Sequence, residues 1–483
     1  MIPTRGRGRS SVLAAPVALF VTALAAACAD GGPSQVLEPA GAGVPASGSG
    51  LASAGAETYD AEVALAWFAL TFELTREEGL LPPPAARAYA YAGVTLWEAV
   101  APGVPGGLSL AGRLNDLEDV PATRQALHWP SVANAALAGI TQRFYTSPRS
   151  RRAIRDLEHD LHARFRREVP AAVLGRSIAH GKRVASAIWL WSLGDGYREF
   201  HDCAVEQQDV PGSWSPTPPG FEAPAEPCWG KLRPFLLPAA DACTPGPHPR
   251  YSEDPASEFH QAALEVYETV NRVTEEQRTI ALYWADLAGE SPTPAGHSLS
   301  IAAQALASLD APLDLAAETF ARVGIGESDA FISCWHAKYH YDMVRPVTYI
   351  QALIDPSWEP VLETPPFPAY SSGHSNDVGA SSTILTGLFG DGFPITDHTN
   401  DGRGFAPRSF DSFFEAADEA AISRLYGGIH YRFDIDRGLD QGRCVGRAVN
   451  RLAFRSGAVA RGEHVVSARR PAVDFRSPRS TEG

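Results

Sequence analysis

The segment Lys338-Tyr-His-Tyr-Asp-Met-Val-Arg345-Pro346 lies at the end of a long stretch with helical periodicity and carries two cations. Seven residues rotate a helix through nearly two full turns, to within about 20°. Lys338 and Arg345 therefore project from one helix face if the helix continues that far, and Pro346 favours a break after it. This pair is the first part of a candidate anion site on a helical body.

A proline-rich approach leads to a turn of small residues in Pro365-Pro-Phe-Pro-Ala-Tyr-Ser-Ser-Gly-His374. Helical periodicity resumes at His374, so we expect a helix to begin at this turn. Backbone N–H groups at a helix N-terminus, together with the Ser372 hydroxyl, form a cup of donors for an oxyanion. His374 lies at the edge of that cup.

A third stretch is Ser423-Arg-Leu-Tyr-Gly-Gly-Ile-His-Tyr-Arg-Phe-Asp434. Its two glycines suit a bend between Arg424 and His430. Asp434 follows His430 by four residues, where a carboxylate can fix the orientation and the tautomer of an imidazole.

Taken singly, each pattern has a plain explanation. A K-x6-R pair is usually a solvated helix face, S-G-H is usually a loop, and a single arginine more often forms a surface ion pair. Their occurrence in this order within 97 residues is what favours a site. Together they supply an inventory suited to a tetrahedral or trigonal-bipyramidal oxyanion: Lys338, Arg345, Ser372, the Gly373 amide, His374, Arg424 and His430.

The series K-x6-R-P, S-G-H and S-R-x5-H-x3-D resembles the signature shared by vanadium-dependent haloperoxidases and type 2 phosphatidic acid phosphatases. Flanking segments resemble bacterial haloperoxidases of the chloroperoxidase-like branch: Trp214-Ser-Pro-Thr-Pro-Pro, Ala281-Leu-Tyr-Trp-Ala-Asp286, Gly296-His297 and Asp329-Ala-Phe-Ile-Ser-Cys-Trp335. The resemblance covers roughly residues 60 to 455.

The resemblance implies vanadate as cofactor, with phosphate able to occupy the same site, and hydrogen peroxide with a halide or a small organic acceptor as substrates. His430 would bond to vanadium, His374 would act as acid and base, and Asp434 would support His430. The vanadate oxygens would be held by Lys338, Arg345, Ser372, Gly373 and Arg424. Lys338 would also polarise bound peroxide. Trp335 and Phe367 would line the halide pocket.

Two alternatives remain open at this stage. A histidine-dependent phosphatase would use the same residues with His430 as the phosphoryl acceptor, because vanadate and phosphate have nearly the same shape. A non-catalytic surface lipoprotein could retain the cup as an anion-binding site, although binding alone would not require His374. The family commonly has Pro before Ser-Gly-His, whereas this chain has Ser371, which gives the cup an extra hydroxyl and a freer backbone.

The periodicity of the rest of the chain predicts an all-α fold, with a large helical body of two stacked bundles. Separate helices are expected at 313–323 and 328–341, and Thr274-Glu-Glu-Gln277 has the form of a capping box. We expect a signal peptide at 1–28, a flexible linker at 29–56, an N-terminal helical region at 57–195, an ordered Pro/Gly-rich loop at 196–255, the catalytic helical region at 256–460 and a polar tail at 461–483.

Composition restricts the function classes further. The 483 residues include 41 Lys and Arg against 56 Asp and Glu, a net charge of −15, which argues against a nucleic-acid partner. Three arginines, an apolar run and small residues before Cys28 predict export and a lipid anchor at Cys28, so membrane contact is expected through lipid only. A disulfide is expected within the loop that holds Cys203, Cys228 and Cys243. Oligomeric state is left open.

Overall fold

Helix α10, Leu313–Tyr341, contacts helices from both ends of the sequence in the computed structural model, which describes residues 54–201, 203–206, 208 and 210–457. The chain divides into two units, 1–50 and 51–483, and the first lies outside the described residues. The signal peptide, Cys28, nearly all of the linker and the tail at 461–483 also lie outside them. The all-α prediction is confirmed.

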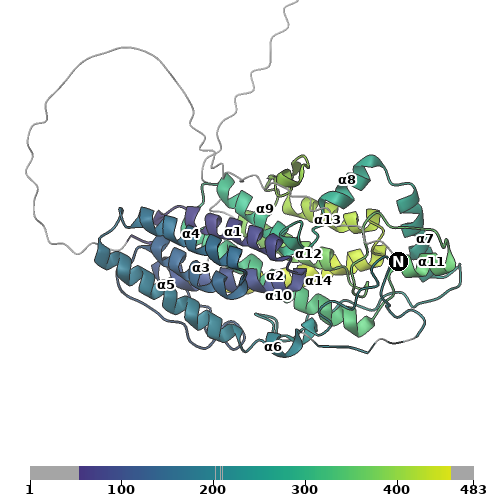
Figure 1. Ribbon diagram of the computed structural model, residues 1–483, viewed down its shortest axis with the longest axis horizontal. Coiled ribbons are helices and arrows are strands. Elements are labelled where there is room, and N and C mark those ends of the chain that lie inside the picture. The colour runs from purple at the N-terminus through teal and green to yellow at the C-terminus, as the bar shows by residue number, and fades with distance from the viewer. Residues whose placement is uncertain (1–53, 202, 207, 209, 458–483) are drawn as a thin grey trace, which may run out of the picture. The chain divides into compact units, whose positions relative to one another are not determined.

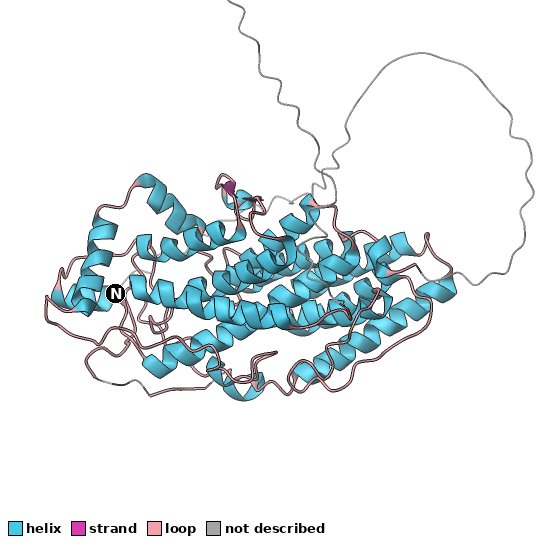
Figure 2. Ribbon diagram, turned by 180° about the vertical axis from the view of Figure 1, so that it is seen from behind, coloured by secondary structure: helices cyan, strands magenta, loops and turns pink. Residues whose placement is uncertain are grey.

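The described helices are α1 Glu62–Glu78, α2 Pro82–Val100, α3 Trp129–Phe144, α4 Pro148–Phe165, α5 Ala171–Ser192, α6 Tyr197–Phe200, α7 Glu258–Asn271, α8 Glu275–Tyr283, α9 Thr293–Ser308, α10, α11 Pro346–Leu353, α12 Gly373–Phe389, α13 Phe413–Tyr426 and α14 Arg432–Arg451. Strands β1 Ile395–Asp397 and β2 Arg408–Phe410 form an antiparallel pair, with Thr396 opposite Ser409. Figure 2 shows how little strand there is beside the helices. Thr274 and Gln277 form the predicted capping box at the start of α8.

The prediction of two helices at 313–323 and 328–341 was wrong, because α10 is continuous. Gly324 and Gly326 lie between the two expected segments, and both serve helix packing. A Cβ on Gly324 would lie 2.9 Å from Ala90 Cα in α2, so the missing side chain lets the two backbones approach closely. Trp67, Trp97 and Phe320 belong to the core around this contact.

On its other side α10 packs against α12 and α14, which run beside each other in Figure 1. A Cβ on Gly438 of α14 would lie 2.7 Å from the Ser372 carbonyl oxygen, and one on Gly379 of α12 would lie 2.7 Å from that of Leu439. These close contacts fix the start of α12 against the start of α14. The Ser-Gly-His turn and the His430 bend are therefore held together by helix packing.

Lys338 and Arg345 do not share a helix. We expected them on one helix face only if the helix continued as far as Arg345, and it does not. Helix α10 ends at Tyr341, Asp342 follows in the left-handed conformation with φ of 46°, and Arg345 is the residue before α11. The helix ends five residues before Pro346, which starts α11 at a position where proline is favoured.

The stretch at 196–255 contains α6, one short 3-10 helix and turns, and two disulfides hold it. Cys203 pairs with Cys228 inside the stretch, and Cys243 pairs with Cys444 in α14, 201 residues away in sequence. Cys334 is a buried free thiol. Among the described helices, none is both long enough and apolar enough to cross a bilayer.

Candidate active site

A cavity of about 270 Å³ lies where the three predicted stretches meet. Six of the predicted site residues line it: Trp335, Phe367, Gly373, His374, Arg424 and His430. The two imidazoles therefore face one space, although they belong to segments 56 residues apart in sequence. Lys338, Arg345, Ser372 and Asp434 are fully buried immediately behind this wall.

His430 is held as a neutral imidazole with one nitrogen turned toward the cup. Its Nδ1–H donates to Asp434 Oδ2 at 3.0 Å, and the same oxygen accepts the backbone N–H of Tyr431. His430 Nε2 accepts a hydrogen bond from Arg345 Nη1 at 3.2 Å. Burial, followed by the charge of Arg345, lowers the pKa of His430 well below its usual value. The Nε2 lone pair is thus free of a proton at neutral pH, as a ligand or nucleophile requires.

His374 pairs with Arg424 on the other side of the cavity. Arg424 Nη1 lies 3.1 Å from His374 Nε2, a geometry in which the guanidinium donates to a neutral ring. Burial, followed by the charge of Arg424, lowers the pKa of His374 well below its ordinary value. His374 is therefore a neutral imidazole at ordinary pH, which is the form that can accept a proton from a group in the cavity.

Arg345 and Lys338 occupy different positions in the cup. Arg345 donates through Nε to the Phe367 carbonyl at 2.8 Å and through Nη1 to the Ile429 carbonyl at 2.7 Å. Its Nη2 is buried without a hydrogen-bond partner among the described residues, and this orphan donor suits an anion. Lys338 Nζ instead donates to the carbonyls of Pro368, Ala369 and Ser371, at 2.6 to 3.0 Å, so it contributes charge from behind the turn.

The Ser-Gly-His turn is a helix N-terminus, as the sequence predicts. Ser372 is the N-cap of α12, and its Oγ accepts hydrogen bonds from the Ser375 backbone N–H and hydroxyl. The extra hydroxyl of Ser371 is not free: it donates to Gln441 Oε1 at 2.6 Å, and Gln441 in turn donates to Ser333. This chain ties the turn to α14 and α10, contrary to the expectation of a freer backbone.

Burial perturbs the pKa values of the three cations of the cup, and the charge of Arg345 adds to the effect on Lys338. Burial lowers the pKa of Lys338 to about 7 and those of Arg345 and Arg424 to about 10. Burial also raises the pKa of Asp434 to about 7, against the opposing effect of Lys338. Arg345 and Arg424 stay charged at neutral pH, and a bound anion would favour the charged form of Lys338. The donor set therefore fits an oxyanion carrying several oxygens.

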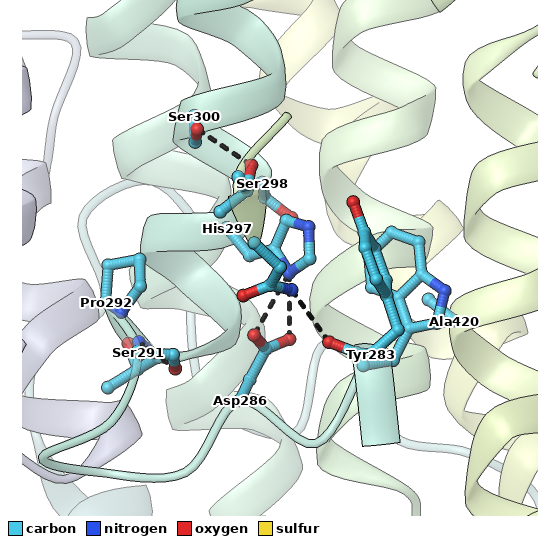
Figure 3. Close-up of polar contacts among 12 residues, drawn as sticks. Tyr283, Asp286, Ser291, Pro292, His297, Ser298, Ser300 and Ala420 are labelled. Carbon is cyan, nitrogen blue, oxygen red and sulfur yellow. Dashed lines mark hydrogen bonds and ion pairs between the residues drawn. The ribbon is translucent and has the colours of Figure 1, made fainter. Parts of the chain in front are cut away.

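The sequence did not identify a second layer behind His374. His297 Nδ1–H donates to Asp286 Oδ1 at 3.0 Å (Figure 3), and its Nε2–H donates to Asp397 Oδ2 at 2.7 Å. Asp286 lines the cavity, and its Oδ2 lies 3.8 Å from His374 Nε2. The Tyr283 hydroxyl also donates to Asp397 Oδ2, at 2.7 Å.

Two donated hydrogen bonds make His297 an imidazolium. Although burial alone would lower its pKa, Asp286 and Asp397 raise it to about 10. The backbone of Asp286 has φ of 48°, a left-handed conformation that is uncommon outside glycine and that aims the carboxylate between the two imidazoles. The segments holding Asp286 and His297 were noted only for their resemblance, and nothing in the sequence linked them to Asp397.

Trp335 and Phe367 lie together on the cavity wall, with ring centroids 5.0 Å apart. Lys338 Nζ lies 5.8 Å and 5.0 Å from these rings. The two aromatic rings predicted to form the halide pocket therefore lie beside the cup, close to the positive charge of Lys338.

Comparison with known proteins agrees with this geometry. The family model described as the VCPO second helical-bundle domain matches residues 318–456. Vanadium chloroperoxidase of Curvularia inaequalis is 30% identical over 169 residues, which cover 24% of this chain and only 28% of that protein.

Two solved bacterial structures are similar over much more of the chain. The crystal structure of the first bacterial vanadium-dependent iodoperoxidase is 36% identical with a TM-score of 0.78, and the match covers 82% of this chain and 97% of that one. A holo-type bacterial vanadium-dependent chloroperoxidase is 15% identical with a TM-score of 0.60, covering 77% and 92%, and shows the shared fold. On the combined strength of the near-complete match at 36% identity and the convergent cup, the chain belongs to the vanadium-dependent haloperoxidase family.

Proposed function

We propose that this chain is a vanadate-dependent haloperoxidase, which uses hydrogen peroxide to oxidise a halide to a hypohalous acid equivalent. The observation that carries the proposal is the convergence of His374, His430 and Arg424 on one cavity, with Arg345 bonded to His430 directly behind it. The bacterial iodoperoxidase that is 36% identical supports the same activity. The relatives do not favour a phosphatase or a binding protein.

Vanadate fits the residues present. The orphan Nη2 of Arg345, the Arg424 guanidinium and the N-terminus of α12 at Gly373 would hold its oxygens, and His430 Nε2 would hold vanadium. When bound, vanadate supplies a Lewis acid that activates peroxide toward attack by halide. Lys338 would add positive charge through the turn, held in place by three carbonyls.

His374 moves the proton in this proposal. Overall, hydrogen peroxide, one halide ion and one proton give hypohalous acid and water, so a proton must leave peroxide and another must reach the departing oxygen. His374 is neutral at ordinary pH, because burial and the charge of Arg424 lower its pKa, and its Nε2 lies 3.1 Å from Arg424 Nη1 and 3.8 Å from Asp286 Oδ2. General acid–base catalysis by a positioned imidazole contributes about 10²- to 10⁴-fold.

We further propose iodide as the halide oxidised with the highest kcat/KM. Iodide gives up electrons most readily of the three common halides, and the relative matched over 97% of its length is an iodoperoxidase. Trp335 and Phe367 form the wall on which the halide would lie. Parallel kcat/KM measurements with iodide, bromide and chloride test this ranking, and a higher value for chloride would overturn it.

We also propose that the protein is exported and lipid-anchored at Cys28. Two disulfides support export, since such bonds persist mainly in oxidising compartments. Mass spectrometry of the N-terminal peptide from a bacterial host, with Cys28→Ala as the control, tests the anchor. A native chain that begins at a residue other than a diacylated Cys28 would refute it.

The activity itself is tested with purified chain loaded with orthovanadate. Triiodide formation from iodide and peroxide is followed by absorbance, and hydrolysis of p-nitrophenyl phosphate by the vanadium-free chain is followed in parallel. We expect triiodide formation that His430→Ala abolishes and that His398→Ala, a change at an exposed histidine, leaves intact. Phosphate release without triiodide formation would refute the proposal.

A further inference from the structure

The mouth of the active-site cavity has an exposed apolar rim. Leu81 and Leu287 line the cavity and are 40% and 41% exposed. Phe221, 64% exposed, lies between Gly220 and Glu222, and both of these neighbours line the cavity. Eight large hydrophobic residues are at least 38% exposed in the described part of the chain. Two of them line this cavity, and a third, Phe221, is adjacent in sequence to two lining residues. Exposed apolar groups concentrated at a cavity mark a binding surface.

The rim continues inward as an aromatic wall. Phe331, Trp335 and Phe367 all line the cavity, with the Trp335 ring 5.5 Å from that of Phe331 and 5.0 Å from that of Phe367. This wall leads directly to His374 and His430. The space of about 270 Å³ far exceeds the needs of a halide ion and peroxide, and it approaches the lower end of ligand pockets, roughly 300 Å³.

The charge at the opening points to the class of ligand. Glu222 and Glu363 both line the cavity and are exposed, and neither forms an ion pair with a described residue. Two carboxylates at an apolar opening disfavour organic anions and tolerate neutral or cationic molecules. An aromatic ring with a neutral or positively charged substituent matches the rim, the wall and the charge together.

We propose that this opening binds a neutral or cationic phenol-type acceptor, which is halogenated in the cavity. This inference rests on the proposed haloperoxidase function. The hypohalous acid equivalent transfers its halogen to a ring carbon. A carbon–halogen bond forms with the ring electron pair, the oxygen–halogen bond breaks, and the ring proton leaves with the released hydroxide as water. Over the full cycle, the phenol, halide, peroxide and one proton give halophenol and two waters.

Product ratios distinguish a bound acceptor from a freely diffusing oxidant. Tyramine and 4-hydroxyphenylacetate, which differ mainly in charge, are supplied together with iodide and peroxide, and iodinated products are quantified. The same mixture treated with reagent hypoiodite gives the reference ratio. We expect the enzyme to favour tyramine at least about fivefold over the reference, and the Glu222→Gln/Glu363→Gln variant to return toward it. A native ratio equal to the reference would overturn the proposal.

Binding without turnover provides an independent measurement. Calorimetric titration of tyramine into the native chain, without vanadate, should give saturable binding that weakens at least about fivefold in Leu287→Ser. Leu190→Ser is the matched control, because Leu190 is 67% exposed but lies on α5 and does not line the cavity. Absence of saturable binding, or equal loss in both variants, would refute the acceptor site. Loss of triiodide formation with binding retained would refute the proposed function alone.

Discussion

His297→Gln should lower the stability of the folded chain by an amount that depends on pH. The imidazolium is 1% exposed and bonds to Asp286 and Asp397 on opposite sides. Removing it leaves two buried carboxylates without their shared cation, and breaking a buried ion pair costs roughly 3–5 kcal/mol. In a protein of this size, each kcal/mol of lost unfolding free energy lowers the melting temperature by about 2–4 °C or somewhat less. We therefore expect the melting temperature to fall by about 10 °C near pH 6.

The sign of the pH effect follows from the raised pKa. His297 has a pKa of about 10 when folded against an ordinary value near 6.5, so its stabilising effect is complete below pH 6.5 and is lost as pH rises toward 10. Scanning calorimetry of both chains from pH 6 to 10 should therefore show the difference in melting temperature shrinking with pH. Asp397→Asn in the His297→Gln background should cost less than in the native chain. A difference that stays constant or widens with pH would refute the imidazolium assignment.

Three further changes test the cup and the cross-link. Arg424→Ala should weaken vanadate binding at least about tenfold, roughly 1.4 kcal/mol, measured by equilibrium dialysis; an unchanged Kd would remove Arg424 from the cup. Because burial lowers the pKa of Lys338 to about 7, the native chain should bind vanadate more tightly than Lys338→Met at pH 6, and this ratio of Kd values should approach one by pH 9; a ratio independent of pH would contradict the assignment. Cys243→Ser/Cys444→Ser opens a link across 201 residues and should cost about 5 kcal/mol in chemical unfolding, so a loss below about 1 kcal/mol would contradict its stabilising role.

Local patterns in the sequence were sufficient to locate most helices and the cup. Helical periodicity located α12, and the Thr274 capping box marked the start of α8. The same local rules misjudged α10, because Gly324 is a helix breaker by propensity and a packing residue in the fold. Propensity describes one segment, whereas the close approach of α2 exists only after folding.

In the candidate site, too, local motifs could be predicted from the sequence, whereas contacts between distant segments could not. His374 and His430 could be named because each lies in a short motif with a chemical reason. Asp286, His297 and Asp397 could not be joined from sequence, since three segments spanning more than 100 residues must meet before the two ion pairs exist. The contacts of Lys338 with three carbonyls depend likewise on the path of the turn at 368–371.

The cup holds more buried positive charge than its free carboxylates balance, and this excess would favour a bound anion. Lys338, Arg345 and Arg424 are each at most 1% exposed, while the carboxylates near them, Asp434 and Asp286, are engaged by histidines. Buried cations without sufficient counter-charge destabilise a fold. An oxyanion that binds only the folded chain raises the free energy of unfolding by about 2.7 kcal/mol when its concentration is a hundred times its Kd. Replacing a cup cation by an apolar residue should therefore raise the stability of the anion-free chain and lower its affinity for the anion, because both effects come from removing the same charge.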